Sequence, residues 1–202
     1  MRSFRGFKPD FTMLANPNQN IWVSRVDGVD IIFRQPRRND SSRSRIAYRG
    51  FTEQTLRKFR RKFIDHDYYD PNRRCKFPLY HGEFPGHLPL IMEVENEIVA
   101  FGEAIFKMGV DFPRFNVGSE DRCVTCGIAV IDKFQGMGLG RIYSPLTDCI
   151  GRTFNCDWIL GTTFSKGALK GIREYDDWQI IREYNGMCDH RKALKERVES
   201  NS

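Results

Sequence analysis

Beyond residue 20, apolar residues recur at spacings typical of regular secondary structure. Alternating or continuous apolar and β-branched runs predict strands, whereas apolar residues three or four positions apart predict helices. By this pattern we expect strands at 29–33, 90–95, 98–106, 123–131, 158–163 and 178–182, and helices that begin at Thr52 or span 138–154, 166–175 and 190–198. Residues 90–106 are typical of a β-hairpin with its turn at 96–97.

The order of these elements predicts the fold class. A strand and a helix precede the hairpin, and strands then alternate with helices, which indicates an α/β or α+β fold with a mostly antiparallel first half and a βαβ unit in the second. The length of 202 residues fits one domain. We expect an irregular arm at 1–20, the domain at 21–185, and a charged helix and tail at 186–202. Residues 35–46 and 65–89 are expected to form loops.

Composition supports a globular, cytoplasmic protein. Hydrophobic residues make up 40% of the chain, and sixteen Phe and three Trp suffice for a core without disulfides. No segment approaches the roughly 18 apolar residues of a membrane helix, so no membrane is expected as a partner. The first residues lack the apolar run of a signal peptide. The six cysteines are therefore expected to be thiols in a reducing compartment.

Cys123 and Cys126 form an isolated C-x-x-C pattern. A zinc site needs four ligands, and neither a second such pair nor a His pair follows. The two cysteines also lie in an expected strand, where positions i and i+3 face opposite sides of the sheet. We therefore expect two buried thiols and no metal.

Positive charge is concentrated between positions 34 and 62. This segment has eleven Lys or Arg residues and two acidic ones, in a chain of net charge +6. The expected helix would carry Arg57, Lys58, Arg61 and Lys62 on its outer face. Such a field would attract a polyanion, which makes nucleic acid a candidate partner. The alternative is a solvated surface helix without a ligand.

A glycine-rich turn follows the strand expected at 123–131. The segment reads Gln135-Gly-Met-Gly-Leu-Gly-Arg141, with a helix expected from Gly138. A strand–turn–helix arrangement points backbone N–H groups and the positive end of the helix dipole at one spot, which suits a phosphate. The Walker pattern fails because Ile142 follows Gly140-Arg141, and the Rossmann pattern fails because no third glycine stands at the required spacing.

The segment resembles the acyl-CoA signature of the GNAT superfamily, Arg/Gln-x-x-Gly-x-Gly/Ala, which Gln135, Gly138 and Gly140 match in full. The resemblance covers about residues 90–183 and is strongest over 122–163. It implies a single-domain GNAT-type fold, a mixed and mostly antiparallel central sheet flanked by helices. It also implies acetyl-CoA, or another acyl-CoA, as co-substrate.

The resemblance further implies a role for each part of the segment. Backbone groups of Ile128 and Val130 would pair with the pantetheine arm of CoA like an added strand. The thioester would lie where the strands at 123–131 and 158–163 splay apart. The pyrophosphate would be bound by backbone amides of Gly136, Met137, Gly138, Leu139, Gly140 and Arg141.

A second block, Gly161-Thr-Thr-Phe-Ser-Lys166 followed by Trp178, resembles a divergent GNAT branch. That branch includes domains fused to ABC-type ATPases and phage proteins related to the DNA-modifying Mom enzyme. Two features depart from the common GNAT pattern. The usual Tyr that protonates the departing thiolate aligns near Ile172, so either Tyr175 or Ser165 substitutes for it or the side-chain acid is absent. Pro145 lies inside the predicted helix and should kink it.

An acceptor amine must lose a proton, which a carboxylate, a His or a water chain can take up. Glu103 interrupts an apolar strand, so it either lines the cleft as the base or faces solvent. His81 and His87, in a Gly/Pro-rich loop, either line the acceptor pocket or are merely exposed.

Taken together, the sequence predicts an N-acyltransferase that moves an acetyl or related acyl group from acyl-CoA to an amine on a small molecule or a protein. One alternative is a Mom-like enzyme that modifies nucleic-acid bases on the same fold. Another is a GNAT-shaped module without catalysis that binds nucleic acid or protein, and the missing Tyr supports it.

Overall fold

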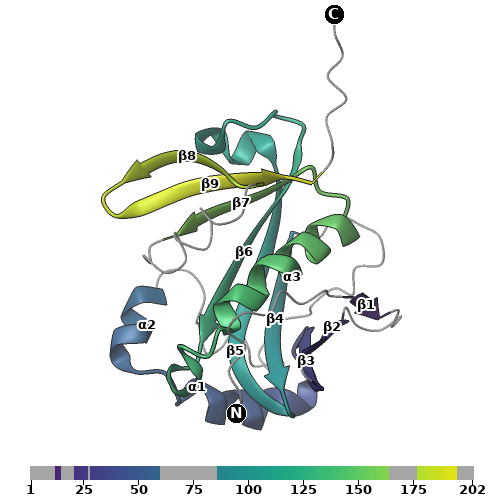
Figure 1. The fold of residues 1–202 in the computed structure, drawn as a ribbon, viewed down its shortest axis with the longest axis vertical. Coiled ribbons are helices and arrows are strands. Elements are labelled where there is room, and N and C mark those ends of the chain that lie inside the picture. The colour runs from purple at the N-terminus through teal and green to yellow at the C-terminus, as the bar shows by residue number, and fades with distance from the viewer. Residues whose placement is uncertain (1–11, 15–20, 27, 60–85, 164–176, 195–202) are drawn as a thin grey trace, which may run out of the picture.

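The computed structural model describes residues 12–14, 21–26, 28–59, 86–163 and 177–194, and their strands form one nine-stranded sheet (Figure 1). The strand order is β1-β2-β3-β4-β5-β6-β7-β9-β8. The strands are β1 Thr12–Leu14, β2 Ile21–Val26, β3 Val29–Arg34, β4 His87–Val94, β5 Glu97–Met108, β6 Arg122–Val130, β7 Trp158–Thr163, β8 Gln179–Tyr184 and β9 Met187–Ala193. The helices are α1 Ser41–Tyr48, α2 Glu53–Phe59 and α3 Leu139–Thr153, with short 3-10 turns η1 Arg38–Asp40, η2 Gly109–Asp111, η3 Pro113–Phe115 and η4 Asp132–Phe134.

The hairpin of β4 and β5 forms the centre of the core. Residues 88–94 and 98–104 are all buried. On one face the ring of Phe106 meets Phe154 at the end of α3, and on the other Phe101 meets Phe51 between α1 and α2. Because side chains alternate along a strand, positions 100, 102, 104 and 106 of β5 face α3 and positions 101, 103 and 105 face away from it.

The second half contains the predicted βαβ unit, in which α3 connects the parallel strands β6 and β7. Leu139, Ile142, Leu146 and Ile150 lie three or four residues apart and are at most 1% exposed, so one face of α3 packs on the sheet. The helix continues through Pro145. Among the described strands all other pairs are antiparallel, which confirms the predicted fold class.

The prediction of a loop at 35–46 is wrong, because this segment contains η1 and most of α1. Its polar sequence folds because buried ion pairs tie it to the sheet. Arg34 binds Asp40 through both terminal nitrogens, at 2.6 and 2.8 Å, and Glu93 of β4 through Nε at 2.6 Å. Arg43 of α1 reaches the other Glu93 oxygen at 2.6 Å. We call Arg34, Asp40, Arg43 and Glu93 the Arg34 network.

The prediction of a charged helix at 190–198 is also wrong over its described part, because residues 187–193 form β9 between β7 and β8; residues 195–198 lie outside the described residues. Its polar side chains are buried against partners on other elements: the hydroxyl of Thr162 in β7 donates to Asp189 at 2.5 Å, and Lys192 lies 2.5 Å from Asp148 of α3. Asn185 and Gly186, both with positive φ, form the tight turn between β8 and β9. An Asn-Gly pair is a strong hairpin signal, and it could have revealed this strand.

The N-terminal arm expected to be irregular contains β1 at Thr12–Leu14, and β2 extends the same edge of the sheet. The helix predicted from Thr52 is confirmed at its start, as α2 begins at Glu53. The helix expected at 166–175 lies outside the described residues, as do the basic residues 60–62. The side chains of Arg57 and Lys58 are not described either.

Candidate functional site

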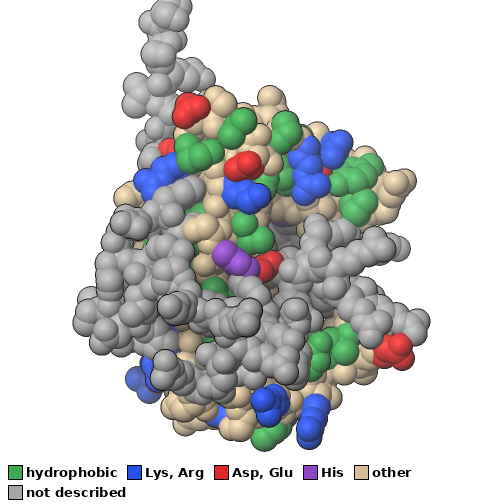
Figure 2. Space-filling model, turned by 180° about the vertical axis from the view of Figure 1, so that it is seen from behind, with side chains coloured by type: hydrophobic (Ala, Val, Ile, Leu, Met, Phe, Trp, Pro, Cys, Tyr) green, Lys and Arg blue, Asp and Glu red, His purple; other side chains and the backbone are tan. Residues whose placement is uncertain are grey.

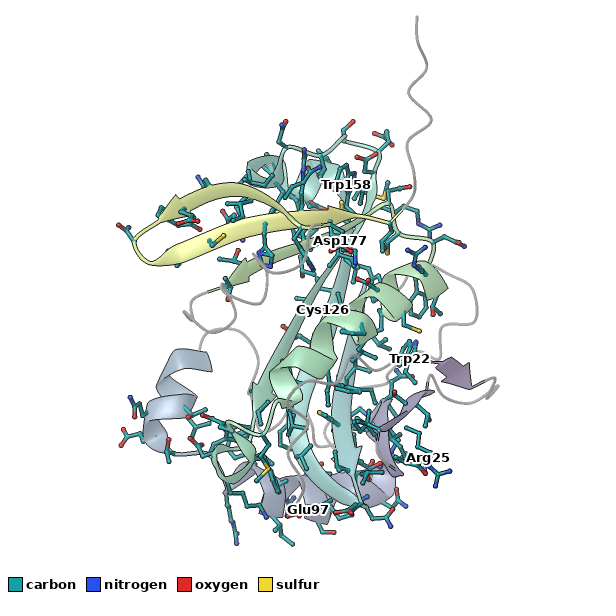
Figure 3. The ribbon with its side chains drawn as sticks, in the orientation of Figure 1. Trp22, Arg25, Glu97, Cys126, Trp158 and Asp177 are labelled. Carbon is teal, nitrogen blue, oxygen red and sulfur yellow. The ribbon has the colours of Figure 1, made fainter. Side chains whose placement is uncertain are left out.

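The parallel strands β6 and β7 separate soon after they begin. They pair over positions 123–125 of β6 and 158–160 of β7. Beyond this point β7 continues alongside β9, and among the described strands none pairs with 126–130 of β6 on this side. The predicted divergence of the two strands is therefore present, and positions 126–130 lie along an open edge; Cys126, where this edge starts, is labelled in Figure 3.

The direction of the backbone groups along this edge follows from one hydrogen bond. The N–H of Ile131 donates to the carbonyl of Val99 at 3.0 Å, in line with the β5–β6 register. In an antiparallel pair, successive residues point their N–H and C=O alternately toward and away from the partner strand. Ile128 and Val130 therefore direct these groups away from β5, toward the open edge.

Two glycines shape the turn that follows the open edge. Gly136 and Gly138 have φ values of 78° and 92°, which residues with a Cβ atom rarely adopt. Gly138 is the N-cap of α3, and no side chain caps the helix. Leu139, 1% exposed, anchors the first turn of the helix in the core. The first amides of α3, which include those of Gly140 and Arg141, lack intrahelical acceptors and add to the positive end of the helix dipole.

The side-chain amide of Gln135 stabilises this turn. Its amide nitrogen donates to the carbonyl of Val130 at 3.0 Å, and it lies 3.4 Å from Asp132. Asp132 in turn accepts hydrogen bonds from the backbone of Thr52 at 2.7 Å and from the hydroxyl of Thr55 at 2.7 Å. Burial raises the pKa of Asp132, but the hydrogen bonds from Thr55 and Thr52 outweigh it and lower this pKa. The turn is thus joined to the start of α2, and the Val130 carbonyl has a partner within the chain.

Glu103 does not face solvent, because it is 4% exposed. One carboxylate oxygen lies 2.7 Å from Nε2 of His87, the first residue of β4, whose side chain is 38% exposed. Glu103 is paired with Gly127, on the stretch of β6 that forms the open edge. The sequence did not link the two residues, because the contact depends on the exact register of β4 against β5, which is irregular at Met92 and Glu93.

The remaining predicted site residues are distributed as follows. Met137 packs against the core from within the turn. Ser165 and Tyr175 lie outside the described residues, and so does His81. Cys123 is fully buried while Cys126 is half-buried, and burial raises the pKa of Cys123 to about 12, so its thiol stays protonated.

The described part of the chain contains neither a cluster of potential metal ligands nor a membrane-spanning helix. Nowhere in it do three or more His, Cys, Asp or Glu side chains gather as ligands for a metal ion. None of its helices has the length and apolar character needed to span a membrane.

Comparisons with known proteins agree with this geometry. Neither a protein-family model nor a curated protein sequence matches the chain. Solved structures do match. The GNAT domain of S. lividans PAT has 14% identity and a TM-score of 0.50, covering 92% of this chain and 97% of that one. A GNAT-family acetyltransferase from Listeria monocytogenes has 14% identity and a TM-score of 0.53, covering 85% and 99%. RimL, a ribosomal L7/L12 alpha-N-protein acetyltransferase, has 8% identity and a TM-score of 0.54, covering 90% and 99%.

These similarities extend over nearly the whole of each matched chain. Together with the strand order and the divergence of β6 from β7, they show that the protein has the GNAT fold. At identities this low the likeness establishes the fold alone, and activity has to be argued from the site.

Proposed function

We propose that this protein transfers an acyl group from acyl-CoA to an amine. The observation that carries the proposal is the open edge at 126–130 of β6, which leads directly into a glycine turn at the N-terminus of α3. An extended polar chain can add to such an edge as a strand, and an anion can bind the helix N-terminus beside it. A ligand with both parts would therefore fit the two features in sequence.

The residues present are suited to CoA. Ile128 would meet the pantetheine arm through its backbone, with Val130 engaged through its N–H because its carbonyl is held by Gln135. Amides of Gly136, Met137, Gly138, Leu139, Gly140 and Arg141 would surround the pyrophosphate. An acyl-CoA would supply an activated acyl group as a thioester. The strands would hold the acceptor close to that group, which lowers the entropic part of the barrier.

For the proton that the acceptor amine loses, the structure supports His87 acting with Glu103. Glu103 is too deeply buried to meet a substrate, whereas the His87 ring is partly exposed. A carboxylate only accepts hydrogen bonds, so Glu103 would orient the ring and stabilise the imidazolium formed when His87 takes up the proton, directly or through water. His87 would be the catalytic residue and Glu103 a positioning residue. Ser165 and Tyr175 remain candidates for the acid.

CoA binding can be tested at the glycine turn. Gly138→Val places a side chain where φ is 92° and the backbone would approach the pyrophosphate. We expect CoA affinity, measured by calorimetry, to fall by at least tenfold, since several amide bonds to a charged group are lost. Gly28→Val is the matched control, because Gly28 also has a positive φ but lies in the β2–β3 turn. Unchanged affinity in a folded Gly138→Val protein would contradict the assignment.

The proton-transfer roles can be tested separately from binding. His87→Gln should lower kcat about a hundredfold, in the range typical of a general base. Glu103→Gln keeps the shape of the side chain and should lower kcat less, with the dissociation constant for CoA and the melting temperature unchanged. A residue needed only for folding would lower the melting temperature instead. Full turnover in both variants would remove the pair from the mechanism.

The nucleic-acid alternative rests on the basic segment 34–62, and it stays a prediction. Two of its arginines, Arg34 and Arg43, pair with Asp40 and Glu93, which reduces the charge available to a polyanion. Arg45 and Arg49 are exposed on and next to α1. A fluorescence titration with oligonucleotides at several salt concentrations tests this partner. Phosphate contacts predict a slope of log affinity against log salt of about −0.9 per contact with duplex DNA.

A further inference from the structure

A buried carboxylate beyond the end of the β6–β7 pairing holds two arginines. Asp189 of β9 is 0% exposed. It accepts hydrogen bonds from the hydroxyl of Thr162 at 2.5 Å and from Nε of Arg182 at 2.9 Å. Arg114, in η3, donates to the Thr162 hydroxyl at 3.1 Å, and its Nε lies 4.0 Å from Asp189. We call Arg114, Thr162, Arg182 and Asp189 the Asp189 network.

The Asp189 network lies on the face of the sheet that also carries Glu103. A Cβ atom on Gly151 of α3 would lie 3.6 Å from Ile159, so Ile159 faces α3 and Thr162, three residues on, faces away. Glu103 faces away from α3 as well. Figure 2 shows this face, with a histidine beside an acidic side chain near its centre and basic side chains above them.

Strand register places Glu103 and the Asp189 network at the same level on the two sides of the open edge. The last β6–β7 pair is Thr125 with Leu160. Gly127, paired with Glu103, and Thr162, paired with Asp189, each lie two residues beyond it. Neighbouring strands are about 4.8 Å apart, so Glu103 and Thr162 are separated by at least two spacings, roughly 10 Å. The proposed thioester position lies between them.

The arginines are held in position but not buried. The side chains of Arg114 and Arg182 are 44% and 51% exposed, whereas Asp189 is inaccessible. Each guanidinium also lies near an aromatic ring, Arg114 at 4.8 Å from Phe115 and Arg182 at 4.5 Å from Tyr184. A guanidinium has five N–H donors in one plane, and the bonds to Asp189 and Thr162 leave donors on both arginines for a ligand.

The charge of the network is positive. Burial raises the pKa of Asp189, but hydrogen bonds from Thr162 and Arg182 and the charges of both arginines lower it overall, so the carboxylate is ionised at neutral pH. Two cations then face one anion, with the anion on the inside. The outer side of the network therefore presents pre-oriented donors and a net positive charge, which suits a carboxylate ligand.

We propose that Arg114 and Arg182 bind a carboxylate group on the amine that accepts the acyl group. This inference rests on the proposed acyl transfer, because that function places the amine over the open edge. The amine would then lie about one to two strand spacings, roughly 5–10 Å, from the carboxylate. The acceptor class is thus an amine with a carboxylate several bonds away.

Equilibrium binding tests the proposal without requiring acyl transfer. The full chain is titrated by calorimetry with ω-amino acids from 4-aminobutanoate to 8-aminooctanoate, and with the corresponding ω-amino amides, in which the carboxylate is replaced by a neutral amide. We expect the best acid to bind roughly ten- to a hundredfold more tightly than its amide, as hydrogen bonds to charged groups do. Arg182→Ala and Arg114→Ala should each remove most of this preference. Arg182→Lys should keep part of it.

Arg25→Ala is the matched control. Arg25 also pairs with an aspartate, Asp30 at 3.3 Å, and it lies on β2, away from Trp158 of β7 in Figure 3. Its removal should leave the acid-over-amide preference unchanged. Equal binding of acid and amide, failure of both to bind, or an equal loss of the preference in Arg25→Ala would overturn the proposal. Acyl transfer without preference for the acids would refute this inference alone, whereas arginine-dependent binding without any transfer would refute the proposed function.

Discussion

The Arg34 network and the Asp189 network have the same chemistry in opposite arrangements. In the first, the central arginine is inside: the Arg34 side chain is 4% exposed and contacts two carboxylates, Asp40 and Glu93, which Arg43, 40% exposed, contacts from the outside. In the second, the carboxylate is inside: the Asp189 side chain is 0% exposed, and two arginines that contact it are about half exposed.

This difference separates a structural tie from a binding surface. A guanidinium enclosed by carboxylates has its donors used within the fold, so it can only hold segments together. Arg34 of β3 joins η1 to β4 in this way, and Arg43 joins α1 to β4. A carboxylate enclosed by guanidiniums fixes their orientation while their outer donors face solvent. We therefore expect substitutions in the first network to change stability, and substitutions at the arginines of the second to change binding.

The largest effect should follow from Arg34→Met. The substitution leaves Asp40 and Glu93 buried without their main cation, and removing one partner of a buried ion pair typically costs about 3–5 kcal/mol. Chemical denaturation should show this loss in the free energy of unfolding. Arg25→Met, which breaks an exposed pair, should cost about 1 kcal/mol at most. Similar losses in the two variants would show that the Arg34 network is not a structural tie.

The second-largest effect should be a dependence of stability on pH that comes from His190, the neighbour of Asp189. Burial lowers the pKa of the neighbouring His190 from 6.5 to about 4. Below pH 6.5 the unfolded chain therefore binds a proton that the folded protein does not, and stability should fall by up to about 3 kcal/mol as the pH drops to 4. The lowered pKa values of Asp40, Asp132 and Asp189 act mainly below their ordinary value of 3.8, so each adds only roughly a few tenths of a kcal/mol near pH 4.

His190→Phe keeps a ring against Trp178, whose ring lies 4.7 Å away, and removes the titration. The free energy of unfolding, measured by denaturation from pH 7 to pH 4, should then lose most of this slope. A slope that persists in His190→Phe would place its source elsewhere.

A smaller loss of stability is expected for Asp189→Asn. The amide keeps the shape and can still accept from Thr162, but it no longer balances Arg182 and Arg114. Loss of a charged hydrogen-bond partner in a buried site costs about 1–3 kcal/mol. Calorimetric unfolding gives this value, and the acid-over-amide preference should fall in the same variant because the arginines lose their fixed orientation. Loss of stability with unchanged preference would show that Asp189 does not position them.

The smallest change in stability is expected for Arg182→Ala. More than half of this side chain is exposed, and exposed ion pairs contribute little to folding. The melting temperature should stay close to that of the parent protein, while the preference for carboxylate ligands is lost. A marked drop in melting temperature would make the Asp189 network a second structural tie and remove the distinction between the two.

Much of the fold and part of the site could be predicted from sequence. The apolar runs of β5, β6 and β7 and the apolar stripe of α3 are local signals, and so are Gly136 and Gly138, whose positive φ values require glycine in the turn. The stretches that were misassigned, 35–46 and β9, are polar. Their residues are buried only because ion pairs with distant segments compensate the cost of burying charge.

The sequence by itself determined where the hydrophobic elements lie and that a glycine turn separates β6 from α3, because strand period, helix period and backbone sterics act within a few residues. Tertiary structure alone decided which charged groups meet. Glu103 meets His87 through the pairing of β4 with β5, and Asp189 meets Arg182 and Thr162 through the insertion of β9 between β8 and β7. Such contacts depend on the exact register of paired strands, which is irregular in both the β4–β5 and the β8–β9 pair, and on the place of β9 next to β7, and local spacing specifies neither.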